Sequence, residues 1–172
     1  MPMRVLAFDP GFERLGVAVV EKVSGVGAGP REKLLYSACV RTDPKLSFEK
    51  RLQALGEATQ ALIQEWQPTV VALEDIYFAN NAKTVIRVSE VRGVLSYLAA
   101  AHNLPLYNYT PLAVKVAITG YGKSDKKAVS AMVVRVLGLQ TKDLKETRRL
   151  DDEMDAIAIG LTCLASVRTH IK

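Results

Sequence analysis

The stretch TVVALEDIYFANNAK, residues 69–83, contains the segment that decides the fold. Its first six residues form a β-branched apolar run too short for a helix, which predicts a central strand of a sheet. Glu74 and Asp75 end this strand with two carboxylates, and Tyr77 and Phe78 follow closely. Acids at the carboxyl end of a central strand lie at the edge where open α/β sheets bind ligands.

The segments around this strand predict a layered α/β fold. Three apolar runs separated by turn signals, 4–8, 15–23 and 33–42, predict strands joined by hairpins, and a fifth strand is expected at 104–109. Helices are predicted from a cap at Ser47 to Trp66, over 82–102, from Thr110, from a cap at Ser124, and over 152–168. This order indicates a five-stranded mixed sheet with helices on both faces, and 172 residues fit a single domain.

Composition narrows the class of protein. No run reaches the roughly 18 apolar residues that a membrane span needs, and the first residues lack a signal-peptide layout, so a cytoplasmic protein is expected. A net charge of +5 and a pI near 9.2 fit nucleic-acid binding without establishing it. Cys39 and Cys163 lie in apolar contexts without metal-ligand spacing and are predicted to be small core residues.

Four carboxylates stand at positions where they can meet. Asp9 ends the first predicted strand and Glu74 the fourth, although for Asp9 alone, directly before Pro-Gly, a turn-forming acid is the simpler interpretation. In the last predicted helix, Asp152 and Asp155 are spaced i, i+3 and share a face. A partly buried pair of acids is costly unless a cation lies between them. An acidic first turn favoured by the helix dipole, or pairing with upstream arginines, explains the pair equally well.

The ligand types favour particular cations. The four acids offer hard oxygen donors, and no Cys/His set accompanies them, which favours magnesium or manganese over zinc. Two such ions about 4 Å apart can activate water and stabilise the leaving oxygen in phosphodiester hydrolysis. Phosphate oxygens of a substrate would complete their ligand shells.

Four motifs in order resemble the RuvC family of Holliday-junction resolvases, nucleases with a ribonuclease H-like fold. They are FDPGFERLGVAVV, LEDIYFANNAKTVIRVSEVRG, VKVAITGYGKSDKKAV and DDEMDAIAIG, and together they extend over nearly the whole chain. Each alone is weak, but the four in this order are specific. The resemblance places the family's acidic tetrad on Asp9, Glu74, Asp152 and Asp155, and the DxxDAIA spacing favours the last two over Asp151.

The resemblance implies a magnesium-dependent endodeoxyribonuclease of recombination and repair, with two ions per active site and manganese as a substitute. It implies a homodimer that binds a four-way DNA junction and nicks two strands symmetrically, with branch-migration proteins of the RuvA and RuvB type as candidate partners. The helix predicted over 82–102, in which Gly93 permits close approach, corresponds to the family's dimer-contact region. An ordinary core helix fits that segment equally well.

The resemblance also implies DNA contacts after the fourth strand. Tyr77 matches the family's stacking aromatic, and Phe78 is a second DNA-binding candidate, although one of the two rings can instead pack in the core. Asp75 departs from the family, which commonly has glutamine at this position. Its carboxylate either alters metal affinity or faces away from the site. The charged segment 140–151 is long for the family and adjoins the last two acids.

Basic residues cluster around the last turn before the penultimate helix. Lys115 and Lys126 match the family's basic residues near the scissile phosphate, and Lys126 is expected to steady phosphate charge. Lys123 and Lys127 enlarge the same patch as DNA-binding candidates, although a solvated basic face explains them as well.

Three other classes compete with this interpretation. YqgF-type nucleases share a DPG…RLGVAV start, but DIYFANNAK after Glu74 favours the RuvC type. Actin-like sugar kinases and ATPases share the first acid and glycines, but need two domains and roughly twice this length. A non-catalytic junction-binding protein has no need for four intact acids.

Overall fold

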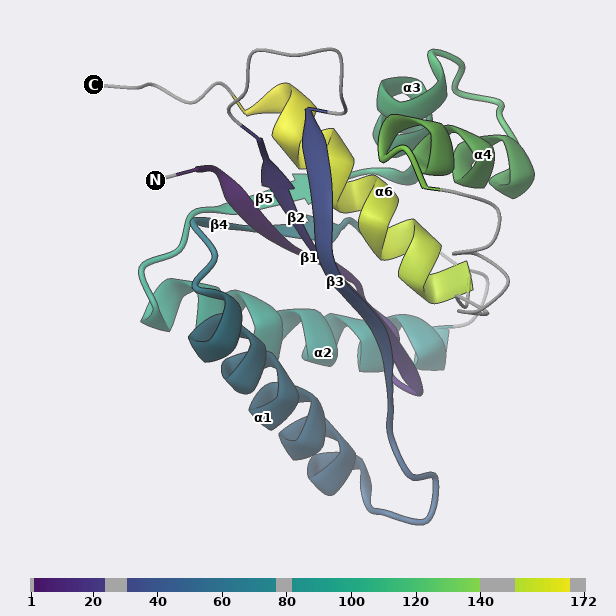
Figure 1. The fold of residues 1–172 in the computed structure, drawn as a ribbon. Coiled ribbons are helices and arrows are strands. Elements are labelled where there is room, and N and C mark those ends of the chain that lie inside the picture. The colour runs from purple at the N-terminus through teal and green to yellow at the C-terminus, as the bar shows by residue number, and fades with distance from the viewer. Residues whose placement is uncertain (1, 24–30, 77–81, 140–150, 168–172) are drawn as a thin grey trace.

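The computed structural model describes residues 2–23, 31–76, 82–139 and 151–167. Its centre is a five-stranded sheet in the order β3-β2-β1-β4-β5 (Figure 1). The strands are β1 (Arg4–Asp9), β2 (Arg14–Lys22), β3 (Glu32–Arg41), β4 (Val70–Glu74) and β5 (Leu106–Tyr109). Pairs β1–β2 and β2–β3 are antiparallel, whereas β1–β4 and β4–β5 are parallel. The prediction of a mixed five-stranded sheet is confirmed.

Helices cover both faces of the sheet, as predicted (Figure 1). They are α1 (Phe48–Trp66), α2 (Ala82–Ala101), α3 (Pro111–Thr119), α4 (Lys126–Val136) and α6 (Asp151–Ser166). Helices α1 and α2 lie on one face, and α6, flanked by α3 and α4, lies on the other. Within the described ranges, no helix is long and apolar enough to cross a membrane.

Alternation along the central strands decides which residues face which helices. In β1, Val5 and Ala7 pack in the core under α6, while Leu6 and Phe8 pack in the core against α1 and α2. All four are essentially inaccessible to solvent, so a slip by one residue would exchange two apolar faces and is opposed by both cores. The same alternation directs Asp9 to the α6 face of the sheet.

Helix α6 crosses the sheet at close range. A Cβ added at Gly160 would lie 2.8 Å from a methyl of Val20 and 3.2 Å from Cβ of Ala7, so a side chain there would push the helix outward. Every residue from Ala156 to Leu164 is buried, which confirms that this helix is covered on both sides and that Cys163 is a core residue.

The predicted helix caps are confirmed at two positions and wrong at a third. Ser47 caps α1 and Thr110 caps α3, each through its side-chain oxygen. The cap of α4 is Asp125 instead of Ser124, and its carboxylate accepts a hydrogen bond from the Ala128 amide at 2.8 Å. The Ser124 hydroxyl is engaged with the Thr119 hydroxyl at 2.7 Å, which leaves the capping position to the next residue.

Candidate active site

The two strand-end acids lie side by side at the carboxyl ends of β1 and β4. Phe8 pairs with Leu73 in the parallel register, so Asp9 and Glu74 occupy the next step of the two strands. Burial, followed by the charges of Glu74, Asp155 and Asp152, raises the pKa of Asp9 from its ordinary 3.8 to about 7. This edge of the sheet therefore concentrates negative charge where little water can compensate for it.

Asp9 and Glu74 act electrostatically as a pair. Burial and the charge of Asp155 raise the pKa of Glu74, whereas a hydrogen bond from Asp9 opposes that rise. Two carboxyl groups in this relation titrate together and can share a proton when no cation is bound. A cation placed between them would take the role of that proton.

The two acids of α6 approach the same edge but have basic partners. Asp152 Oδ2 lies 3.3 Å from Nε of Arg14, and Asp155 Oδ2 lies 2.8 Å from Nζ of Lys126. Among the residues that the structure describes, no three His, Cys, Asp or Glu side chains converge tightly enough to hold a metal ion by themselves. The site therefore offers carboxylate donors for a metal ion in an open arrangement, in which each of the two α6 acids faces a basic side chain.

Gly16 brings the start of α6 close to the strand-end acids. It pairs with Asp9 across β1–β2 and with Cys39 across β2–β3. A Cβ added at Gly16 would collide with the backbone carbonyl of Asp152 and lie 3.2 Å from Cβ of Asp9. Absence of a side chain at this one position lets the backbone of α6 rest on the sheet beside Asp9.

The prediction that Cys39 is a core residue is wrong. Its side chain is only partly buried, and its thiol donates to Asp152 Oδ2 at 3.7 Å. Burial and the Asp152 charge raise the pKa of the thiol, so it remains protonated and serves as a donor. The apolar neighbours of Cys39 in the sequence hid this role, because the contact depends on strand register with Gly16.

The lysines predicted near the scissile phosphate lie beside the acids. A pocket of about 290 Å³ is lined by Glu74, Pro111, Val114, Lys115, Lys126, Val129 and Asp155. The hydrogen bond to Asp155 raises the pKa of Lys126, which keeps this side chain cationic. Lys123 and Lys127 are exposed around the start of α4 and are not among the residues that line this pocket. Tyr77, Phe78 and nearly all of segment 140–151 lie outside the described residues.

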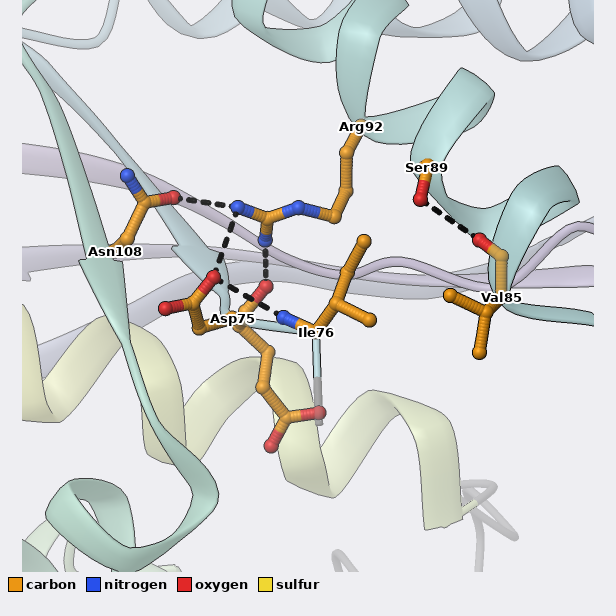
Figure 2. A network of polar contacts seen from close by, with 7 residues as sticks. Asp75, Ile76, Val85, Ser89, Arg92 and Asn108 are labelled. Carbon is orange, nitrogen blue, oxygen red and sulfur yellow. Dashed lines mark hydrogen bonds and ion pairs between the residues drawn. The ribbon is translucent and has the colours of Figure 1, made fainter. Parts of the chain in front are cut away.

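Asp75 faces away from the acid cluster, as strand alternation requires (Figure 2). Its Oδ1 lies 3.3 Å from a guanidinium nitrogen of Arg92, which comes from α2. Arg92 also donates to the backbone carbonyl of Glu74 and to Oδ1 of Asn108 at 2.9 Å. Of the two alternatives for Asp75, the structure therefore supports a carboxylate that faces away. Sequence reasoning missed both Arg14 and Arg92, because neither has a sequence neighbour that marks it as a partner of an acid.

The donor set fits hard divalent cations. The candidate ligands are carboxylate oxygens from Asp9, Glu74, Asp152 and Asp155, and burial leaves the first two in need of positive charge. Oxygen-rich open sites of this type suit magnesium or manganese, which keep positions for water and phosphate oxygens. A mixed sheet with acids at two central strand ends and on the last helix defines the ribonuclease H-like class of nucleases.

Comparison with known proteins assigns the family within that class. Residues 5–163 match the model of the family described as crossover junction endodeoxyribonuclease RuvC. A relative of that name from Leifsonia xyli is 42% identical over 161 residues, covering 94% of this chain and 73% of the relative. One from Thermosipho melanesiensis is 40% identical over 163 residues, covering 95% and 97%. The chain belongs to the RuvC family and is an endodeoxyribonuclease.

Solved structures agree with this assignment. The structure of Thermus thermophilus RuvC matches with a TM-score of 0.81 and 32% identity, covering 94% of this chain and 93% of that chain. A structure titled as the same protein in complex with a Holliday junction substrate matches with a TM-score of 0.82 and 30% identity, with the same coverage. The ribonuclease H-like fold expected from the sequence motifs is confirmed.

Proposed function

We propose that this chain resolves four-way DNA junctions by symmetric paired nicking, using two magnesium ions in each active site, with manganese as a substitute. The observation that carries the proposal is the buried edge at which the Asp9 pKa rises to about 7 under the charges of three neighbouring acids. A cation placed among these acids would offset their mutual repulsion and the cost of their burial. The junction as substrate is supported by the relative that was solved with one.

Each of the four acids has a defined role in this proposal. Asp9 and Glu74 would hold the ions from the sheet, and Asp152 and Asp155 would hold them from α6. When bound, the ions would supply charge neutralisation for the attacking and leaving oxygens of phosphodiester hydrolysis. Water would attack phosphorus directly as the bond to the leaving oxygen breaks, the water would give up a proton to solvent, the leaving oxygen would take up a proton from solvent, and no covalent enzyme intermediate would form.

Lys126 would exchange its carboxylate partner for a phosphate when DNA binds. Its Nζ lies 2.8 Å from Asp155, in the pocket that Lys115 also lines. A DNA phosphate entering this pocket would offer Lys126 an alternative anion and free Asp155 toward the acid cluster. Lys126 would then steady phosphate charge, with Lys115, Lys123 and Lys127 contributing to DNA binding. Tyr77 and Phe78 stay predictions as aromatic contacts to DNA bases.

The dimer is also part of the proposal, because two nicks require two active sites. The outer side of α2 supports it: Ile86 and Tyr97 are 60% and 71% exposed, and they share a stripe with Gly93. Apart from its chain neighbours and the backbone of its own helix, no described atom lies within 4 Å of the place where a Gly93 Cβ would stand. RuvA- and RuvB-type branch-migration partners and a cytoplasmic location stay predictions.

The test is a cleavage assay on a synthetic four-way junction and a matched linear duplex, each with magnesium and with chelator. Paired, symmetric, magnesium-dependent nicks in the junction alone would support the proposal. Binding without cuts in magnesium or manganese would favour a junction-binding module. Equal cutting of the duplex would retain the nuclease chemistry and remove the junction as its specific substrate.

A further inference from the structure

Two consecutive acids at the end of β4 point to opposite faces of the sheet. Glu74 lines the pocket that Lys126 and Asp155 share on the α6 side. Asp75 lies on the α2 side, where Figure 2 shows it beside Arg92. Both are carboxylates on adjacent residues, so a shift of the strand end by one residue would exchange the acid that faces the cluster. A contact in the fold must therefore determine which of the two carboxylates faces the acid cluster.

Arg92 makes three contacts at this point. One guanidinium nitrogen donates to the backbone carbonyl of Glu74, and another lies 3.3 Å from Asp75 Oδ1 and 2.9 Å from Asn108 Oδ1 (Figure 2). The acceptors come from β4, the residue that follows it, and β5. Because the guanidinium is planar and rigid, satisfying all three acceptors sets the orientation of the peptide groups at the strand end.

Other contacts hold Asp75 in the same orientation. Its amide donates to the Tyr109 carbonyl at 2.8 Å, which extends the β4–β5 pairing by one residue. Its Oδ1 also accepts from the Ile76 amide at 3.1 Å. The Arg92 side chain is 14% exposed and that of Asp75 is 50% exposed, so solvent screens the ion pair in part, whereas the contact with the Glu74 carbonyl is partly buried.

We propose that Arg92 is a positioning residue that separates the two carboxylates. It fixes the backbone of Glu74 so that this side chain faces the metal site, and it neutralises Asp75 on the opposite side. The inference rests on the proposed role of Glu74 as a metal ligand. Without Arg92, Asp75 competes with Glu74 for the cation, and the strand end loses the contact that holds Glu74 in place.

The test compares R92A, D75N and the double variant R92A/D75N with the unmodified chain. The two readouts are Mn²⁺ binding to the protein alone, by isothermal titration calorimetry, and the rate of junction nicking. Partners that orient metal ligands typically contribute 10- to 100-fold, so R92A is expected to weaken Mn²⁺ binding and slow nicking by about tenfold or more. D75N alone should remain within about twofold, since Asn108 and the Glu74 carbonyl still hold Arg92.

The double variant separates positioning from a merely structural role. Asparagine cannot compete for the cation, so R92A/D75N should recover part of the Mn²⁺ affinity and nicking rate that R92A loses. R92K, which keeps the charge but lacks the fork, should be intermediate, and D75N should rescue it in the same direction. S89A is the matched control for the Mn²⁺ measurement, since Ser89 is on the same helix and its hydroxyl donates to the Val85 carbonyl in that helix, at 2.8 Å (Figure 2).

Folding is checked by circular dichroism melting, and R92K carries the test if R92A does not fold. A folded R92A that binds Mn²⁺ as the unmodified chain does would overturn the inference. Failure of D75N to rescue both Arg92 variants would overturn it as well. The Mn²⁺ measurement needs no DNA, so it is independent of the proposed function. If the unmodified chain binds Mn²⁺ but cuts no junction, the proposed function is wrong, and the role of Arg92 is still tested by comparing Mn²⁺ binding among the variants.

Discussion

The strand-end acids and the helix acids reach the same edge of the sheet in different electrostatic states. Burial raises the pKa of both Asp9 and Glu74, and neither has a salt bridge among the contacts of the described residues. Asp152 and Asp155 instead lie within 3.3 Å and 2.8 Å of a basic side chain. In the described part of the chain, the strand-end acids therefore lack a salt-bridge partner, and a metal ion could supply the positive charge. The helix acids must instead exchange a basic side chain for a metal ion.

The largest expected effect is on catalysis at the strand end. D9N should lower the rate of junction nicking by more than about a hundredfold, since losing a ligand exceeds the loss of an outer contact. Junction binding should persist, because it rests on lysines and arginines that contact phosphates. Gel-shift and nicking assays on the same junction measure both, with D43N at an exposed loop acid as the control. Cleavage by D9N at the unmodified rate would remove Asp9 from the site.

The second prediction concerns stability and pH without divalent cations. The folded-state pKa of Asp9, about 7, lies above its ordinary 3.8, so the folded protein binds more protons between these values. The contribution of Asp9 to stability is therefore greatest at low pH and falls as pH rises toward 7. At pH 8 in chelator, D9N should raise the free energy of unfolding by at most about 4 kcal/mol, taking about 1.4 kcal/mol per pKa unit.

Urea unfolding at pH 5 and pH 8 measures this effect. D152N is the comparison within the site, and it should show no such gain, because it leaves Arg14 without its carboxylate partner. Adding Mg²⁺ at pH 8 should stabilise the unmodified chain more than D9N. If the free energy of unfolding of D9N and of the unmodified chain changed equally between pH 5 and pH 8, the inference that the strand-end acids lack a salt-bridge partner among the described residues would be wrong.

The third prediction tests how the two pairs are brought together. G16A should destabilise the fold by about 1–3 kcal/mol and slow nicking, because the added methyl group meets the Asp152 carbonyl. G93A is the matched control for the melting curves alone, since its added methyl meets no described atom outside its own helix and should stabilise the monomer by about 0.5–1 kcal/mol. Melting curves measure the loss of stability in G16A, and nicking rates measure its loss of activity relative to the unmodified chain. A G16A chain with unmodified stability and activity would show that α6 need not lie this close to the sheet.

The smallest effect is expected at Arg14, the basic side chain that Asp152 must release before it can bind a metal ion. R14A should lower the Mg²⁺ concentration for half-maximal nicking by roughly two- to threefold, because it removes a partly exposed competitor for Asp152. K126A should differ in kind: nicking should fall about tenfold or more, since Lys126 also steadies phosphate charge. Magnesium titrations of the nicking rate distinguish the two, and a higher magnesium requirement for R14A would contradict exchange at Asp152.

Local patterns carried much of this fold and part of its site. Short apolar runs predicted the five strands, because buried strands require them, and Asp9 and Glu74 were predicted at strand ends by the turn and by the end of the run. The spacing of Asp152 and Asp155 predicted a shared helix face. The cap of α4 at Asp125 was missed because Ser124 and Asp125 are both capable caps, and only the contact with Thr119 selects between them.

The sequence by itself determined which residues form strands and helices and which acids end them, because those features depend on neighbours within a few residues. Only the tertiary structure decided the partners of those acids. Arg14 and Cys39 reach Asp152 across 138 and 113 residues of chain, and Arg92 reaches the end of β4 from the next helix. Such contacts follow from strand register and helix packing, which are set by the whole core and leave no local signal.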